Sequence, residues 1–124
     1  MEYSKDPAPD PNDVLIEMML DKTAYTTKPG KDDFKRISNS LSHGRCVLSL
    51  GELIDHVTRG CTFAPGVFQD DRRSNETWVQ QQVFCLDFDH GLRINDFLET
   101  CRQRDVHPVF VYPTFSHTEA EHRF

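Results

Sequence analysis

The sequence lacks the long apolar run that a membrane-spanning helix needs. No stretch approaches the roughly 18 apolar residues of such a span, and the amino terminus continues into Pro- and Asp-rich sequence instead of an apolar signal region. We therefore expect a soluble, cytoplasmic protein with no membrane partner.

Closely spaced cysteines are also missing. The chain has no C-x-x-C motif and no compact Cys/His cluster of the spacing that zinc sites use. We interpret the four cysteines as reduced thiols. Cys85, in an apolar run, and Cys101, in a helical pattern, are expected to be buried as small hydrophobic residues. The other two are Cys46 and Cys61.

A basic excess is absent as well. The 124 residues include 14 Lys and Arg against 20 Asp and Glu, a formal net charge of −6. This balance argues against a protein that coats nucleic acid nonspecifically, which would usually be basic, but acidic metal ligands can hide a local basic patch. The length suits a single domain with one modest core.

The first 33 residues are predicted to contribute little to the hydrophobic core. Residues 1–33 are predicted to form a flexible amino-terminal arm, because prolines and charges dominate its start, with a short helix over Val14–Leu20. Asp21–Asp33 is predicted to be a loop, and Phe34–Ser38 a strand. Residues 34–124 are predicted to form the folded domain.

A helix is predicted to begin after Ser49. Ser49 and Glu52 have the spacing of a capping box, apolar residues follow at helical intervals, and Gly60 is a stop signal. The segment Cys61–Asn75 is expected to be a loop.

The last part of the chain predicts a βαβ unit. An alternating and then apolar segment after Glu76 predicts a central strand that ends at Asp87 and Asp89. A helix capped by Asn95 and a second strand at Val109–Tyr112 follow. A right-handed crossover would bring the carboxyl ends of the two strands side by side.

Asp87 and Asp89 lie two residues apart, so strand alternation would put both carboxylates on one face. Two carboxylates on one face repel each other and raise each other's pKa. A divalent cation would neutralise them, as Mg²⁺ held by one or two carboxylates and substrate phosphates does. The predicted crossover would add Thr114, Ser116 and His117 to this site.

The segments FCLDFDHG and VFVYPTFSHTEAEHRF, with WVQQQ upstream, resemble the first two motifs of the archaeo-eukaryotic primase superfamily, especially the primase-polymerase domains of phage and plasmid replication proteins. The resemblance implies an α+β fold, a primase-polymerase-like (RRM-like) catalytic core. It implies a DNA primase or polymerase, a nucleotidyltransferase of DNA replication that uses Mg²⁺ or Mn²⁺.

The resemblance also assigns residues and partners. Asp87 and Asp89 would be the catalytic metal ligands, and His117 would contact the phosphates of the incoming nucleotide, with Ser116 and Arg123 beside it and the hydroxyl of Thr114 available as a further contact. The partners would be nucleoside triphosphates and a single-stranded DNA template, and a replicative helicase domain or protein could be another. Since Phe124 precedes any third acidic motif, we expect the amino-terminal portion of a longer catalytic domain.

Two other functions fit the residues. A strand ending in Asp-x-Asp, followed by a helix and a strand ending in Thr or Ser, also describes a haloacid-dehalogenase-like phosphatase, with Asp87 as nucleophile and Asp89 as acid and base. A noncatalytic, nucleic-acid-associated replication module is the second alternative. For His117 itself, a turn histidine bonded to a backbone carbonyl is an alternative to a nucleotide contact.

Overall fold

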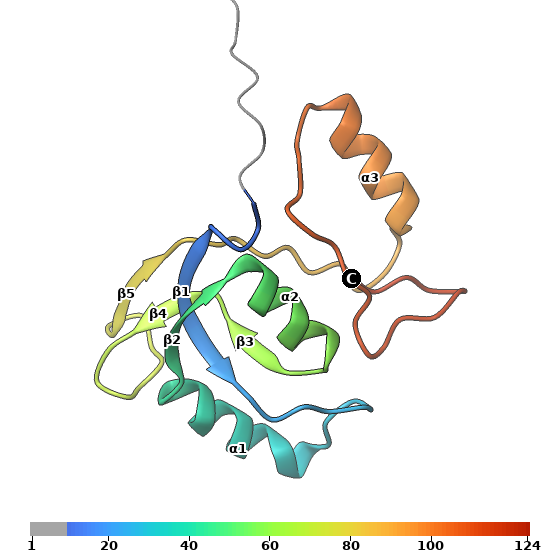
Figure 1. Cartoon of the computed structure of the whole chain (residues 1–124). Helices are drawn as coiled ribbons and strands as arrows, with labels where there is room; N and C mark the ends of the chain where they lie inside the picture. Colours follow the sequence, from blue (N-terminus) through green and yellow to red (C-terminus); the bar gives the residue numbers. More distant parts are fainter. Residues whose placement is uncertain (1–9) are drawn as a thin grey trace, which may run out of the picture. The chain divides into compact units, whose positions relative to one another are not determined.

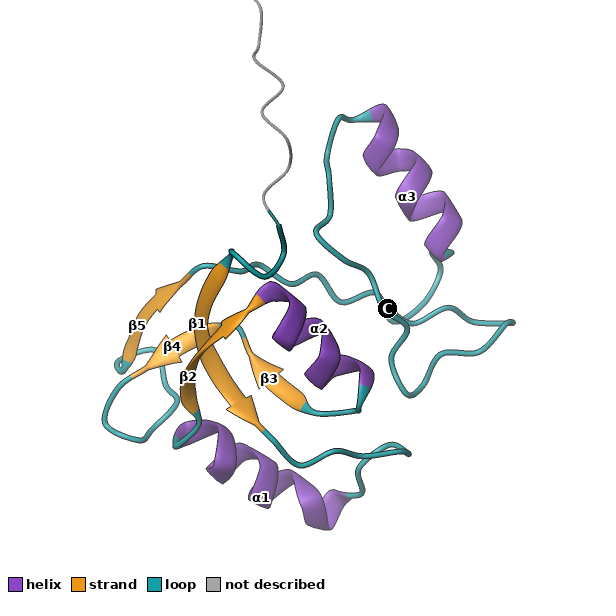
Figure 2. Cartoon of the chain, in the orientation of Figure 1, coloured by secondary structure: helices purple, strands orange, loops and turns teal. Residues whose placement is uncertain are grey.

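The computed structural model describes residues 10–124 as an α+β fold with antiparallel sheets and three helices (Figures 1 and 2). Residues 1–9 of the predicted arm lie outside the described residues. The chain divides into two compact units, the first ending at Phe84 and the second spanning Cys85–Phe124. No helix among the described residues is long and apolar enough to cross a membrane.

The first unit contains a three-stranded sheet in the order β2-β1-β3. Its central strand, β1 (Leu15–Asp21), pairs antiparallel with β2 (Arg45–Ser49) and with β3 (Thr62–Ala64). β2 and β3 therefore run parallel to each other on either side of β1. Because α2 (Leu50–Thr58) connects them, this part of the chain is a split βαβ unit.

A second, two-stranded sheet pairs β4 (Gly66–Phe68) with β5 (Trp78–Gln81), again antiparallel. Two glutamines from the end of this sheet reach β1. The Gln80 amide donates to the Glu17 carboxylate at 2.8 Å, and the Glu17 backbone N–H donates to the Gln82 side chain at 2.7 Å. The predicted strand after Glu76 is thus confirmed as far as Gln81.

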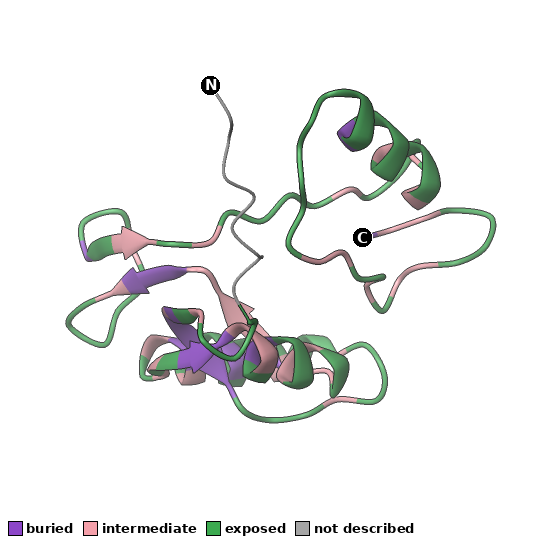
Figure 3. Cartoon of the chain, turned by 45° about the horizontal axis from the view of Figure 1, so that its top comes forward, coloured by how far each residue is buried: buried purple, intermediate pink, exposed green. Residues whose placement is uncertain are grey.

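α1 (Lys31–Ser42) covers one face of β1. Met19 packs there with Ile37 and Leu41 of the helix in a buried cluster. Alternation sends Met18 and Leu20 to the opposite face, and both are also buried. β1 is therefore enclosed on both faces. Figure 3 colours the buried residues purple, and most of them belong to the first unit.

Asp21, at the end of β1, is the charged residue of this core. Its carboxylate accepts hydrogen bonds from both terminal nitrogens of Arg36, at 2.8 and 3.3 Å, and from the Ser40 hydroxyl at 3.0 Å. Burial acts to raise the pKa of Asp21, but the hydrogen bonds from Arg36, the Thr23 backbone and Ser40 outweigh it and hold the pKa below its ordinary value. The buried negative charge of Asp21 is thereby paired with a cation and hydrogen-bonded.

The predicted helix after Ser49 is confirmed as α2. The Ser49 hydroxyl accepts from the Glu52 backbone N–H at 3.1 Å, and the Glu52 carboxylate accepts from the Ser49 N–H at 3.0 Å. The chain leaves the helix at Gly60, whose φ of +86° and close approach to the Tyr25 carbonyl leave no room for a Cβ. The capping box and the stop signal both have the roles predicted from sequence.

Three expectations for the first unit are wrong. Val14–Leu20 is not a helix, because its residues form β1, where burial on both faces removes the usual alternation. The central strand of the sheet thus lies within the range predicted to be an arm. Phe34–Ser38 is part of α1 instead of a strand, and the predicted loop Cys61–Asn75 contains β3 and β4.

The second unit has one helix, α3 (Ile94–Gln103), and no strand among its residues, which are all described. Three phenylalanine rings hold it together: the Phe88 ring lies 5.0 Å from Phe97 of α3 and 5.1 Å from Phe124, measured between centroids. The helix is as predicted, but Arg93 occupies the N-cap position instead of Asn95. The predicted strands at 83–89 and Val109–Tyr112 do not form, so the predicted βαβ unit is wrong.

All four cysteines are free thiols, as predicted. Cys101 is buried on the inner side of α3. Cys85 is exposed, contrary to expectation, because the apolar run that contains it forms no packed strand: Phe84 and Leu86 are 81% and 72% exposed.

Candidate functional site

The acidic pair lies in a segment without helix or strand, and the backbone of one residue in this segment, Phe88, is anchored by hydrogen bonds. Phe88 exchanges both backbone hydrogen bonds with Phe124, at 2.8 and 3.1 Å, which is the pattern of a hydrogen-bonded pair between antiparallel segments. The Phe88 ring packs against Phe97 and Phe124. Successive side chains of an extended chain point to opposite sides, so alternation about Phe88 would direct Asp87 and Asp89 away from this ring cluster. Both are exposed.

Tyr112 lies close to this segment. Burial raises the pKa of its hydroxyl, and the negative charges of Cys85 and Asp87 raise it further. Its ring also stacks on Phe110 at 5.8 Å. The residues expected to form the second strand are therefore near the acidic pair, although they are not paired with it in a sheet.

The second motif forms a hairpin over residues 114–124. The Thr114 backbone N–H donates to the Arg123 carbonyl at 2.9 Å, and the Thr118 N–H donates to the Glu121 carbonyl at 3.0 Å, which closes the turn. All four residues predicted to contact a nucleotide lie in this hairpin: Thr114, Ser116, His117 and Arg123.

The end of the hairpin links the two motifs. In an extended chain, the backbone groups of successive residues point to opposite sides. Arg123 accordingly bonds Thr114 on one side, while Phe124 bonds Phe88 on the other. Phe88 and Thr114 are thus each bonded to one of two consecutive residues. The acidic pair and the hairpin are therefore two segments of one small assembly.

His117 is held by its own hairpin. Its Nδ1 accepts a hydrogen bond from the Arg123 backbone N–H at 3.2 Å. A nitrogen that accepts is unprotonated, so the neutral ring carries its proton on Nε2. The sequence alternative, a histidine bonded to a backbone carbonyl, does not apply to Nδ1, because this nitrogen accepts instead of donating.

Two of the other residues predicted to contact a nucleotide, Thr114 and Arg123, already interact with groups of the hairpin. The Thr114 hydroxyl donates to the Arg123 carbonyl at 3.4 Å. The Arg123 guanidinium lies 3.5 Å from the Glu121 carboxylate and is 37% exposed, so this pair is weakened by solvent. Ser116 is half-buried.

Two further residues, one in the hairpin and one bonded to it, were not singled out from sequence. The His122 ring lies 4.7 Å from that of His117, and its Nδ1 accepts from the Ile94 backbone N–H, at the start of α3, at 3.0 Å. Arg93 donates from Nη1 to the Glu119 carbonyl at 3.3 Å. The five-residue spacing between His117 and His122, on either side of a turn, is the one signal in the sequence that could have indicated this contact.

Two carboxylates are the available metal ligands at this site. Within residues 10–124, no group of three or more His, Cys, Asp or Glu side chains could hold a metal ion. An exposed carboxylate pair of this kind fits a Mg²⁺ or Mn²⁺ ion that also binds substrate phosphates and water. It does not fit a closed structural site, which needs four protein ligands.

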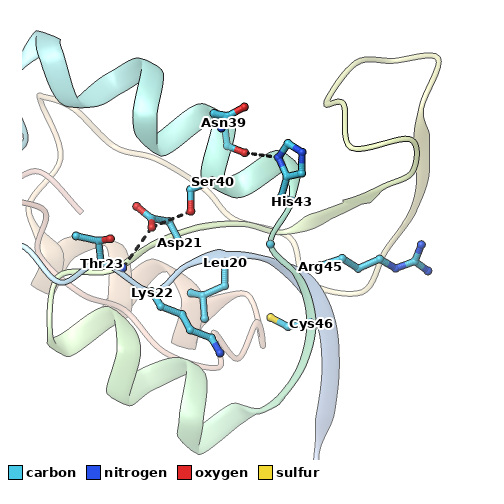
Figure 4. A pocket seen from close by; sticks show the side chains of 10 residues that line it. Leu20, Asp21, Lys22, Thr23, Asn39, Ser40, His43, Arg45 and Cys46 are labelled. Atoms are coloured by element: carbon cyan, nitrogen blue, oxygen red, sulfur yellow. Dashed lines mark hydrogen bonds between the residues drawn. The ribbon is translucent and has the colours of Figure 1, made fainter.

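A hollow lies elsewhere, in the first unit. This open hollow of about 580 Å³ is lined by residues at the end of β1, the end of α1 and the start of β2 (Figure 4). Its carboxylate, Asp21, is already bonded to Arg36, Ser40 and the Thr23 backbone. None of the predicted site residues lines it.

No protein-family model matches the chain, and no curated protein or solved structure matches it significantly. The function is therefore inferred from the residues of this chain and from their geometry.

Proposed function

We propose that the chain carries a nucleotide- and metal-binding site of the primase-polymerase type and acts in metal-dependent nucleotide addition during phage or plasmid DNA replication. Its substrates would be nucleoside triphosphates, with a single-stranded DNA template. The RRM-like catalytic core implied by the motif resemblance is part of the same proposal.

The observation that carries the proposal is the exposure of Asp87 and Asp89 on either side of an anchored residue. Phe88 is fixed by two backbone hydrogen bonds and two ring contacts, and alternation about it favours a common side for the two carboxylates. Two exposed carboxylates on one side repel each other and favour a divalent cation between them. A metal bound there would supply charge stabilisation to the phosphates and lower the pKa of an attacking hydroxyl.

The hairpin supports the nucleotide part of the proposal. Nucleotidyl transfer needs hydrogen-bond donors and positive charge beside the acidic pair to hold the triphosphate. His117 carries its proton on Nε2, which can donate to a phosphate oxygen. Arg123 offers a charge-assisted fork at the same hairpin. The backbone links through Arg123 and Phe124 keep these groups near the acidic segment.

Calorimetric titration with Mn²⁺, with and without a nonhydrolysable nucleoside triphosphate, tests the proposal. The wild-type chain should bind Mn²⁺, and nucleotide should bind more tightly when the metal is present. The double variant Asp87→Asn, Asp89→Asn should lose both effects. Because both aspartates are exposed, the substitutions should change the free energy of unfolding by no more than about 0.5 kcal/mol.

The matched control is the double variant Asp70→Asn, Asp71→Asn. These neighbouring aspartates are exposed in the first unit and have φ values of +62° and +50°, which asparagine also tolerates. The control removes the same charge and should leave Mn²⁺ binding unchanged. Equal Mn²⁺ affinity in the wild type and the Asp87, Asp89 variant would refute the metal site. Release of phosphate from a simple phosphate ester, lost in Asp87→Asn, would support the phosphatase instead.

A further inference from the structure

His117 and His122 form a pair across the turn of the hairpin. Their ring centroids are 4.7 Å apart and the rings are tilted by 50°. Both residues are half-buried. The pair is the densest group of imidazole nitrogens among the described residues of the second unit.

The backbone fixes the protonation of both neutral rings in the same way. The Nδ1 of His117 accepts from the Arg123 N–H at 3.2 Å, and the Nδ1 of His122 accepts from the Ile94 N–H at 3.0 Å. Each neutral ring must then carry its proton on Nε2. The neutral pair therefore carries two Nε2–H donors on rings whose centroids are 4.7 Å apart.

Positive charge lies beside these donors. Arg93 is close enough to His122 to disfavour its protonated form, and it is bonded to the Glu119 carbonyl of the turn. Arg123 belongs to the same hairpin. The negative groups nearby are Asp96, Glu119 and Glu121, and Glu121 is already paired with Arg123 at 3.5 Å.

We propose that His122 shares with His117 the binding of the phosphate groups of a nucleoside triphosphate, through the Nε2–H of each ring, with Arg93 supplying nearby positive charge. The proposal rests on the proposed function for the nature of the substrate. It adds one recognition residue, His122, and one charge, Arg93, to the residues predicted from sequence.

Asparagine substitutions separate phosphate binding from a purely structural role. The Asn side-chain oxygen lies near the position of a histidine Nδ1, so His122→Asn and His117→Asn can keep the acceptor for the backbone N–H. Both variants lose the Nε2–H donor. His107→Asn is the matched control, because His107 is exposed, pairs with Asp105 and lies beyond the opposite end of α3 from Ile94.

The first measurement is a calorimetric titration with inorganic tripolyphosphate in the absence of metal. Each single variant should bind tripolyphosphate about tenfold more weakly than the wild type, the size expected for one lost hydrogen bond to a charged group. The control should bind as the wild type does. Amide hydrogen exchange at Ile94 and Arg123 should be unchanged in the variants, which shows that the hairpin is intact.

With tripolyphosphate, any of three outcomes overturns the inference: no binding by the wild type, wild-type affinity in His122→Asn, or an equal loss in His107→Asn. A nonhydrolysable nucleoside triphosphate should repeat the tripolyphosphate result, whereas a single-stranded oligothymidine should bind equally to the wild type and His122→Asn. A loss confined to the oligothymidine would also overturn it, by assigning the pair to a DNA backbone.

The same variants distinguish this inference from the proposed function. Mn²⁺ binding at Asp87 and Asp89 should be unaffected by His122→Asn. If Mn²⁺ binding needs both aspartates while His122→Asn keeps full tripolyphosphate affinity, the inference fails and the proposed function stands. If the histidine variants weaken tripolyphosphate binding but no variant or wild type binds Mn²⁺, the anion site stands and the proposed function fails.

Discussion

The two units of the chain are stabilised in different ways. The first, up to Phe84, contains all but two of the buried hydrophobic residues described, and β1 is enclosed on both faces. The second has only Cys101 and Phe124 as buried hydrophobic residues, and it exposes Leu86 and Val109 at about 70% of their surface. A cluster of three phenylalanine rings and a set of backbone hydrogen bonds maintain the second unit instead.

The residues that stabilise the fold and the residues predicted to bind ligands therefore lie in different units. Buried apolar area is the dominant stabilising contribution to folding, and it lies in the first unit. The residues predicted to bind metal and nucleotide all lie in the second unit, where half-buried and exposed polar groups remain accessible to a ligand. Sites of this kind are commonly found in the less stable parts of a protein.

The largest effect expected is that of Leu53→Ala. Leu53, on α2, is fully buried, and its truncation leaves a cavity that should lower the free energy of unfolding of the first unit by about 2–5 kcal/mol. Residue-resolved hydrogen exchange should show lost protection in β1 and β2, with protection in α3 unchanged. The neighbouring Ile54→Ala, at a side chain 36% exposed, is the control and should cost much less. Equal loss of protection in α3 would contradict the separation of the two units.

A smaller effect is expected for Arg36→Met, which removes the cation paired with Asp21. The Asp21 carboxylate stays buried and keeps its bonds from Ser40 and Thr23, so the loss should be about 1–2 kcal/mol at neutral pH. Since the folded pKa of Asp21 is below its ordinary value of 3.8, its stabilising contribution is present above that pH and is lost as the pH falls through the folded pKa.

Urea unfolding of Arg36→Met at neutral and acidic pH checks this expectation, because the difference from the wild type should shrink in acid. Arg59→Met is the matched control. Arg59 forms an exposed pair with Asp55 at 3.0 Å on α2, and its loss should cost no more than about 0.5 kcal/mol. An equal loss of unfolding free energy in the two variants would mean that the burial of Asp21 does not make its ion pair more stabilising than the exposed one.

The smallest effect expected is a pH dependence of the second unit. Partial burial, the charge of Arg93 and His117 lower the pKa of His122 below its ordinary value of 6.5, against the opposing effect of Glu119 and Asp96. The unfolded chain therefore takes up the proton first. Neutral His122 therefore contributes to stability above its pKa in the unfolded chain. This contribution is lost as the pH falls through its pKa in the folded chain.

Hydrogen exchange in α3, corrected for intrinsic rates and followed from about pH 8 to about pH 5, measures this effect. The wild type should lose protection over this range, and His122→Asn should lose less because it has no group to titrate there. His107→Asn should behave as the wild type does. An identical profile in the wild type and His122→Asn would show that His122 does not couple protonation to the stability of this unit.

The elements predicted correctly from sequence are those with local signals. α2 has a capping box and a glycine stop within one short segment, and α3 has Phe97 and Cys101 on one side. β1 was missed because its run of apolar residues fits a buried strand and a helix equally well, and burial on both faces depends on α1, which is distant in sequence. Phe34 was assigned to a strand because the window was too short to reveal the helical spacing of Ile37 and Leu41.

The candidate site was predictable in part. The spacing of Asp87 and Asp89 predicts that both point to one side, and the anchoring of Phe88 is consistent with this alternation. The expected parallel strand pair does not form. Arg123 and Phe124, at the end of the second motif, bond to Thr114 and Phe88 instead, which no local pattern indicated. The five-residue spacing between His117 and His122 is a local signal, but it does not by itself select His122, because the contact depends on the turn between them.

The sequence by itself determined three local features: the capping of α2, the helical face of α3 and the free thiols. The two helix features depend on residues within one or two turns of helix. Only the tertiary structure decided that β1 is a central strand, that Phe84 and Leu86 are exposed, and that His117 and His122 meet. Those outcomes depend on which distant segments pack together, because burial is a property of the assembled chain and not of any short stretch of it.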